Sequence, residues 1–98
     1  MMRGNRQVKF FVVSYDIPDD RRRARVHKLL SGYGTWIQYS VFECFLSDKE
    51  LVQLRGKLNK LIRADEDKIR IYTLCQPCLS KVEAIGGSQP EEEKVYVL

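Results

Sequence analysis

The sequence has no long apolar run and few cysteines for its 98 residues. No stretch approaches the ~20 apolar residues that a membrane-spanning helix needs, so we expect no membrane partner. The three cysteines, Cys44, Cys75 and Cys78, are an odd number, unlike the disulfide framework of a small secreted protein. Residues 1–7 are polar and lack the apolar core of a signal peptide. These absences together predict a cytoplasmic protein.

Histidine is scarcer still, because His27 is the only one. A closed zinc site needs four ligands, and the pair Cys75 and Cys78 could add only Cys44 and His27, which lack a suitable spacing. A thioredoxin-type CxxC would follow the first strand and precede a helix, whereas this pair follows a late strand. We therefore expect structural or incidental roles for the cysteines, and a surface or packing role for His27 rather than general base catalysis.

Positive charge is unevenly distributed along the chain. The formal net charge is +4; residues 1–40 hold eight Lys/Arg against three Asp, and residues 41–98 hold nine against ten acids. A localised basic face is typical of proteins that bind a polyanion. The uneven charge favours nucleic acid or phosphate as the partner, with a solvated helix face as the alternative.

Turn and capping signals divide the chain into strands and helices. The apolar run 8–15 predicts a buried strand that Pro18 ends, and Asp19 or Asp20 caps a helix that stops at Gly32. Residues 35–46 predict two short strands with a bend near Tyr39 and Ser40, or one kinked strand. Ser47 and Glu50 form a capping box for a helix ending near residue 62, and residues 68–75 alternate as a strand.

The resulting order, β-α-β-β-α-β, is typical of an α+β, ferredoxin-like fold. In this fold, two helices cover one face of a four-stranded antiparallel sheet. We expect one domain, 1–98, with a core over 8–85 that includes a short strand at 81–85. A flexible acidic linker, 86–93, and a β-prone C-terminal strand, 94–98, follow, and this strand could pair with a partner subunit. The small core makes a homodimer economical, but the fold does not specify a function.

Asp16 is the sharpest candidate for chemistry. It ends an apolar strand, where an acid adds little stability, and Asp19 and Asp20 already serve as capping residues. Magnesium commonly keeps several waters and takes only one or two protein carboxylates. Two copies of Asp16 at the axis of a dimer would therefore suit Mg²⁺ (or Mn²⁺). Such a metal polarises a phosphodiester and lowers the pKa of a bound water.

Four arginines follow Asp16 on the first helix. Arg21 and Arg25 are four positions apart and therefore share one helix face, and Arg22 lies close to that face. Arg23 lies between them in the sequence. We expect this group to position backbone phosphates.

Three motifs carry a resemblance to a known family. They are residues 12–17 (VVSYDI) with 20–23 (DRRR), residues 38–44 (QYSVFEC) and residues 68–75 (KIRIYTLC). Over about 8–85, the chain resembles the small CRISPR-associated protein that partners the CRISPR integrase in spacer acquisition. The resemblance implies a homodimer with metal-dependent endonuclease activity on single-stranded RNA or double-stranded DNA. It assigns the catalytic and metal carboxylate to Asp16, and nucleic-acid binding to Tyr15, Arg23, Arg25 and Phe42.

One residue departs from the family pattern, and two other functions remain open. Trp36 stands where many members have a basic residue, so one phosphate contact is replaced by a side chain that would stack on a base or pack. The first alternative function is a non-catalytic DNA-binding scaffold that bridges the integrase and tolerates Asp16→Asn. The second is a toxin-like ribonuclease of the same architecture.

Overall fold

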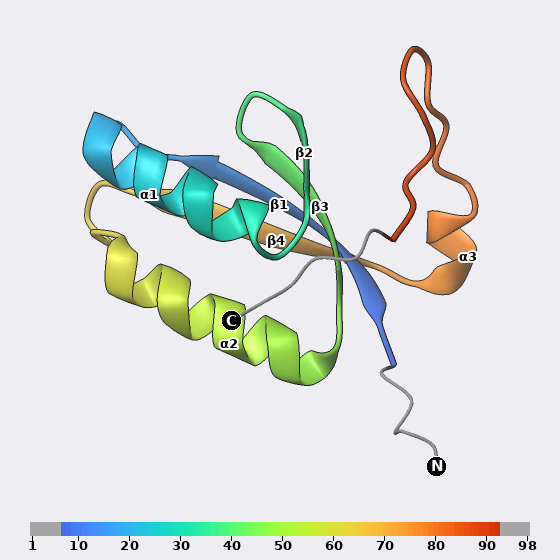
Figure 1. Ribbon diagram of the computed structural model, residues 1–98, viewed down its shortest axis with the longest axis horizontal. Coiled ribbons are helices and arrows are strands. Elements are labelled where there is room, and N and C mark those ends of the chain that lie inside the picture. The colour runs from blue at the N-terminus through green and yellow to red at the C-terminus, as the bar shows by residue number, and fades with distance from the viewer. Residues whose placement is uncertain (1–6, 93–98) are drawn as a thin grey trace.

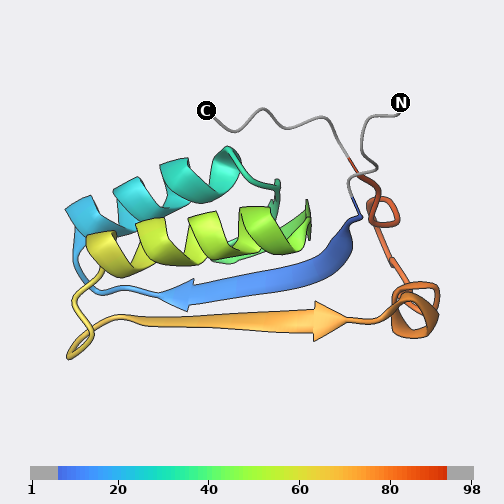
Figure 2. The same cartoon turned by 90° about the horizontal axis from the view of Figure 1, so that it is seen from below.

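The computed structural model describes residues 7–92 and arranges them as one sheet covered by helices on one face. The elements are β1 (Lys9–Asp16), α1 (Asp20–Ser31), β2 (Thr35–Gln38), β3 (Val41–Leu46), α2 (Asp48–Leu61), β4 (Lys68–Leu74) and α3 (Gln76–Leu79). The strand order is β2-β3-β1-β4, and all neighbours are antiparallel. Figure 2 shows α1 and α2 on the same side of the sheet. The expected ferredoxin-like α+β fold is confirmed.

Alternation along the strands explains why the helices cover one face. Every second residue of β1 points toward the helices, where it meets apolar residues of both. The buried core comprises Phe11, Val13, Tyr15, Ile17, Val26, Leu30, Tyr33, Phe42, Cys44, Leu46, Leu54 and Leu58. Burying this apolar surface is the main stabilising contribution to the fold. Within residues 7–92, no helix has the length and apolarity to cross a membrane.

The predicted helix starts and the predicted bend are confirmed. Asp19 caps α1 by accepting from the Arg22 amide at 2.9 Å. The capping box of α2 has both bonds, from the Glu50 amide to Ser47 Oγ at 3.2 Å and from the Ser47 amide to Glu50 Oε1 at 2.8 Å. The bend between β2 and β3 places Tyr39 at a positive φ of 45°, so two strands form rather than one.

The expected strand at 81–85 is wrong. The chain leaves β4 through α3, whose amides at Leu79 and Ser80 bond to the carbonyls of Cys75 and Gln76. Pro77 suits the first turn of a helix, because its fixed φ is helical and its missing N–H would have no partner there. Residues 81–92 contain no strand. The strand expected at 94–98 lies outside the described residues, as does the last linker residue, 93.

Replacing each of two glycines by alanine should have opposite effects on the free energy of unfolding. A Cβ at Gly34 would lie 2.4 Å from Cys44 Sγ and 2.5 Å from the Glu43 carbonyl oxygen, whereas a Cβ at Gly56 in α2 meets nothing within 4 Å. We expect Gly34→Ala to lower the free energy of unfolding by about 2 kcal/mol through overpacking. Gly56→Ala should raise it by about 0.5–1 kcal/mol through helix propensity. Urea unfolding of both variants measures these changes in the free energy of unfolding. A lower free energy of unfolding in Gly56→Ala would contradict the prediction.

Candidate functional site

The face of the sheet without helices carries Asp16. It is the last residue of β1 and exposed, and it pairs in register with Lys68 of β4, as Ser14 pairs with Arg70. Because side chains alternate along a strand, these four residues share the face opposite the buried core. We call this face the open face; on β1, β3 and β4 it carries Phe10, Val12, Ser14, Asp16, Val41, Glu43, Phe45, Lys68, Arg70, Tyr72 and Leu74.

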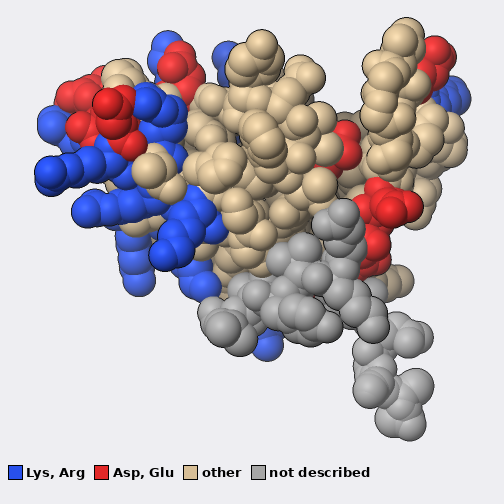
Figure 3. Space-filling model, turned by 45° about the horizontal axis from the view of Figure 1, so that its top comes forward, with Lys and Arg blue, Asp and Glu red and all other residues tan. Residues whose placement is uncertain are grey.

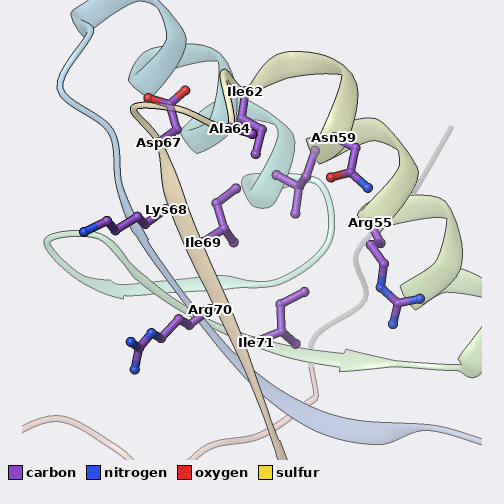
Figure 4. A pocket seen from close by; sticks show the side chains of 10 residues that line it. Arg55, Asn59, Ile62, Ala64, Asp67, Lys68, Ile69, Arg70 and Ile71 are labelled. Atoms are coloured by element: carbon purple, nitrogen blue, oxygen red, sulfur yellow. The ribbon is translucent and has the colours of Figure 1, made fainter.

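A small hollow on this face holds Asp16 between two cations. It has a volume of about 220 Å³ and is lined by Ser14, Tyr15, Asp16, Lys68 and Arg70. Figure 4 shows Lys68 and Arg70 projecting from one side of β4 while Ile69 and Ile71 project toward α2, where they line a larger pocket of about 540 Å³. One carboxylate and two positive side chains therefore meet where β1 ends and β4 begins.

Sequence reasoning missed Lys68 and Arg70 as site residues. Their alternation with Ile69 and Ile71 indicated that both lie on one face, but nothing local indicated that this face is the one that carries Asp16. The pairing of β1 with β4 brings them together across more than 50 positions of the chain.

The donors around Asp16 would suit an open magnesium site rather than a closed one. Among residues 7–92, no three His, Cys, Asp or Glu side chains gather closely enough to hold a metal. Asp16 is the one carboxylate that lines the hollow, beside the hydroxyl of Ser14. Since Mg²⁺ takes one or two protein carboxylates and fills its shell with water and phosphate oxygens, Asp16 fits such an ion once a second carboxylate completes the site.

Tyr15 lies on the opposite face from its neighbour Asp16. Its side chain is buried among core residues, and its hydroxyl lies 3.1 Å from His27 Nδ1. Burial raises the pKa of the Tyr15 phenol, so the group stays protonated. The Tyr15 amide donates to the Ser40 carbonyl oxygen at 3.1 Å. The expected contact of Tyr15 with nucleic acid conflicts with this burial, and its geometry instead anchors the end of β1.

Phe42 is likewise a core residue. Its side chain is 0% exposed, and its ring centroid lies 5.1 Å from that of His27 and 6.5 Å from that of Tyr15. The expected direct contact of Phe42 with nucleic acid is wrong because the ring has no exposed surface. Of the surface and packing roles expected for His27, the structure shows packing, since its ring also meets Trp36 edge-on at 5.9 Å.

The four arginines of α1 do not act as one group. Arg21 and Arg25 are exposed and form no ion pair with the residues that the structure describes. Arg23 spans the β1–α1 loop: its Nη1 donates to the carbonyl oxygens of Ile17 at 2.9 Å and Pro18 at 3.3 Å, and its Nη2 bonds Asp20. Arg21 and Arg25 are therefore available to phosphate, while Arg23 braces the loop beside Asp16.

Arg22 is occupied by acids that lie more than 40 residues away. Its Nε donates to Asp67 Oδ2 at 2.8 Å and its Nη2 to Asp67 Oδ1 at 3.1 Å, and Nη2 also reaches Glu66 at 3.0 Å. The Asp67 side chain is 0% exposed and that of Arg22 is 15% exposed. Hydrogen bonds from Arg22 hold the pKa of Asp67 below its usual range. This pair fixes α1 against the start of β4, so we assign Arg22 to the fold rather than to phosphate binding.

Positive charge gathers at one end of the molecule. Figure 3 shows Lys and Arg side chains crowded where β1 passes into α1 and α2 passes into β4, while the neighbouring surface is mostly uncharged. The two exposed cysteines, Cys75 and Cys78, follow β4 at the opposite end of the molecule (Figure 1), and Cys44 is buried. The Asp16 hollow therefore opens at the basic end of the protein.

Comparisons with known proteins agree on one family. The model of the family described as CRISPR associated protein Cas2 matches residues 9–82. The CRISPR-associated endoribonuclease Cas2 1 of Chloroflexus aurantiacus is 46% identical, over 91% of this chain and 99% of its own. The CRISPR-associated endonuclease Cas2 2 of Thermus thermophilus is 42% identical, over 92% and 97%.

A solved structure extends the likeness to three dimensions. A chain of a partial Cas6-RT-Cas1–Cas2 complex superposes with a TM-score of 0.71 at 29% identity, covering 87% of this chain and 99% of its own. Sequence and fold thus agree. The chain belongs to the CRISPR-associated Cas2 family, the nucleases of CRISPR adaptation.

Proposed function

We propose that this nuclease acts as a homodimer and hydrolyses phosphodiester bonds at a magnesium site shared by the Asp16 carboxylates of both subunits. The observation that carries the proposal is the hollow on the open face, where Asp16 lies with Lys68 and Arg70. A carboxylate attracts a divalent cation, and two cationic side chains beside it attract the phosphate that the cation must contact. The arrangement therefore suits a metal-assisted cut in a polyanion.

The uncovered surface of the sheet supports the homodimer. Away from its charged end, the open face carries apolar side chains such as Val12, Val41 and Tyr72, and Tyr72 is 48% exposed. β4 is an edge strand, whose unpaired amides and carbonyls can pair with another strand. The β-prone segment 94–98 of a second subunit has a suitable composition for that pairing. A dimer formed across the open face would bring a second Asp16 to the first.

Each residue of the hollow has a distinct role in this proposal. Asp16 holds the metal; Mg²⁺ (or Mn²⁺), when bound, lowers the pKa of a water and polarises a phosphoryl oxygen. Arg70 offers a planar fork to two phosphate oxygens, and Lys68 offers a mobile point charge. The hydrogen bond with Tyr72 raises the pKa of Arg70, so this side chain stays charged. Ser14 can donate its hydroxyl to a phosphate oxygen in the same hollow.

Single-stranded RNA and double-stranded DNA are the proposed substrates. The relatives in Chloroflexus and Thermus are named endoribonuclease and endonuclease, and both polymers present the phosphates that Arg21 and Arg25 can contact. The test incubates the dimer with labelled single-stranded RNA and duplex DNA in Mg²⁺, in Mn²⁺ and in EDTA. We expect cleavage with either metal and none in EDTA. Equal cleavage in EDTA would contradict the metal site, and a monomer in sedimentation would contradict the shared site.

Phosphate binding by Arg70 predicts a change in salt dependence. Arg70→Gln removes one phosphate contact, so the slope of log K against log [salt] should fall by about 1 for every sequence tested. Lys49→Gln is the matched control, because Lys49 is exposed at the start of α2, at the other end of the molecule. Fluorescence anisotropy with labelled DNA, at salt concentrations from about 50 to about 200 mM, measures both slopes. Equal slopes for the two variants would indicate that Arg70 does not contact phosphate.

A non-catalytic scaffold between integrase subunits is the second candidate. It is favoured by the likeness to a chain from a complex named Cas6-RT-Cas1–Cas2. In this role the basic end grips DNA and no metal is needed. The two candidates differ in one experiment: spacer acquisition in cells that carry Asp16→Asn. Full acquisition would indicate that the scaffold suffices, and loss of acquisition with intact integrase binding would indicate that cleavage is required.

A further inference from the structure

The turn between β2 and β3 presents apolar side chains to solvent. Trp36 is 56% exposed, Ile37 is 44% exposed and Tyr39 is 87% exposed. We call these three residues the aromatic tip. Single exposed apolar side chains are common on proteins, whereas several within one short turn make that turn a candidate binding surface. None of these three residues belongs to the buried core.

The aromatic tip is held in one arrangement. Trp36 donates its indole Nε1–H to the Tyr39 carbonyl oxygen at 2.8 Å, and the edge contact with His27 braces the same ring. Tyr39 adopts a φ of 45°, a conformation uncommon for a residue with a bulky side chain. The Tyr39 backbone is therefore strained, while the Tyr39 ring is exposed to solvent. The braced Trp36 ring therefore loses little conformational freedom when it binds a flat partner.

The aromatic tip lies at the same end of the sheet as Asp16. Ser40, the residue after Tyr39, bonds the amide of Tyr15, which precedes Asp16. Figure 1 shows the β2–β3 turn beside the end of β1. Trp36 contacts α1 through His27, on the helix side of the sheet, whereas Asp16 lies on the open face. A bound strand would therefore pass around the end of the sheet from the rings to the carboxylate.

We propose that the aromatic tip stacks unpaired nucleobases and leads a single strand toward Asp16. The proposal rests on the proposed function, because it needs a nucleic-acid substrate. Proteins that hold single strands combine aromatic rings, which stack on any base, with cations that track the backbone. The uncharged tip beside the basic end provides both (Figure 3). The ligand class is an unpaired base of RNA or DNA, and a paired duplex offers such a face only at its ends.

The single tryptophan makes the stacking directly observable, since Trp36 is the only one in the chain. The experiment titrates the full-length dimer in EDTA with a single-stranded DNA, the matching RNA, and an abasic oligonucleotide of equal length. We expect both base-carrying strands to quench the Trp36 fluorescence and the abasic backbone to leave it unchanged. Equal quenching by the abasic strand would overturn the proposal, because phosphate contact alone would then explain it. If the RNA and the DNA strand quench the fluorescence to different extents, the difference would identify which of the two is the preferred ligand.

Tyr39→Gly is the cleanest variant, because glycine adopts a positive φ without strain and only the ring is lost. We expect single-strand affinity to fall about tenfold, with blunt-duplex affinity unchanged. Trp36→Leu should act similarly and Trp36→Phe should restore binding, as measured by anisotropy of a labelled strand. Ile85→Ala is the control, because Ile85 is 96% exposed and lies outside the aromatic tip. This variant should leave the single-strand affinity unchanged.

Two outcomes with the variants would reject stacking. If Tyr39→Gly and Trp36→Leu, both folded by circular dichroism, bind single strands as the parent does, the aromatic tip has no role in them. If they instead lose binding to the purified integrase while strand binding is kept, the aromatic tip is a protein interface. Asp16→Asn should quench normally, so a failure of cleavage at Asp16 would not be mistaken for a failure of stacking.

Discussion

Asp16→Asn should abolish metal-dependent cleavage and leave nucleic-acid binding intact. The amide keeps the size of the side chain but removes the charge that holds the cation. A bound metal supplies several kcal/mol of transition-state stabilisation, so the cleavage rate should fall about 1,000-fold. Because the Asp16 side chain is exposed and lies outside the buried core, the melting temperature should stay close to that of the parent. Cleavage and anisotropy assays on one protein preparation measure both effects.

Mixed dimers would show whether two Asp16 carboxylates share one metal. The dimer to test pairs one parental subunit with one subunit that carries Asp16→Asn, and it is purified through two different tags. It should cleave at well under half the parental rate if both carboxylates hold the same ion. Independent sites in each subunit would give half the rate. The half-rate outcome would reject the shared site while keeping Asp16 catalytic.

Asp65→Asn is the matched control for the loss of a carboxylate. Asp65 is an exposed acid in the turn between α2 and β4, near the basic end but outside the hollow. This variant should cleave at the parental rate. A similar loss in Asp65→Asn would mean that net charge, rather than a metal at Asp16, determines the rate.

Arg22→Ala should be strongly destabilising, because it leaves the Asp67 carboxylate buried without its main partner. The pair has bidentate geometry, with distances of 2.8 and 3.1 Å, and the Asp67 side chain has no exposed surface. Removing one member of a buried pair costs far more than breaking a surface pair. We expect a loss on the order of 10 °C in melting temperature. Arg21→Ala, which removes an exposed arginine that forms no ion pair with the described residues, is the control and should change it little.

The same pair predicts how stability depends on pH. Hydrogen bonds from Arg22 lower the pKa of Asp67 in the folded protein, relative to a value of 3.8 in the absence of partners. The carboxylate therefore contributes stability that is fully present above about pH 4 and is lost as the pH falls through the lowered pKa. Urea midpoints of the parent and Asp67→Asn should differ at pH 7 and converge in acid. A constant difference down to about pH 2 would contradict this contribution.

Loss of the pair should also weaken the site. Asp67 accepts the Arg63 amide at 2.8 Å and directly precedes Lys68, the register partner of Asp16. The pair therefore fixes where β4 begins. A folded Arg22→Lys variant keeps the charge but loses the planar fork, so it should bind phosphate-rich ligands more weakly even where its melting temperature is only modestly reduced.

Features of this protein whose causes are local can be predicted from its amino-acid sequence. Asp19, Ser47 and Glu50 cap helices through bonds that span three residues. The apolar run 8–15 predicts β1, and a lone histidine on a helix favours a surface or packing role for His27 over catalysis. Local causes of this kind give the element order, and with it the ferredoxin-like fold. They also single out Asp16, because an acid at the end of an apolar strand is recognisable without any contact.

The surroundings of each functional side chain, by contrast, depend on how the elements pack. Arg22 looked equivalent to Arg21 until the fold brought Asp67, 45 residues away, to its guanidinium. Phe42 and Tyr15 belong to motifs that suggested nucleic acid, yet packing of α1 on the sheet buries them. Lys68, Arg70 and the aromatic tip reach Asp16 through strand pairing and hydrogen bonds between distant segments. Such contacts depend on how the layers pack, which no local pattern in the chain encodes.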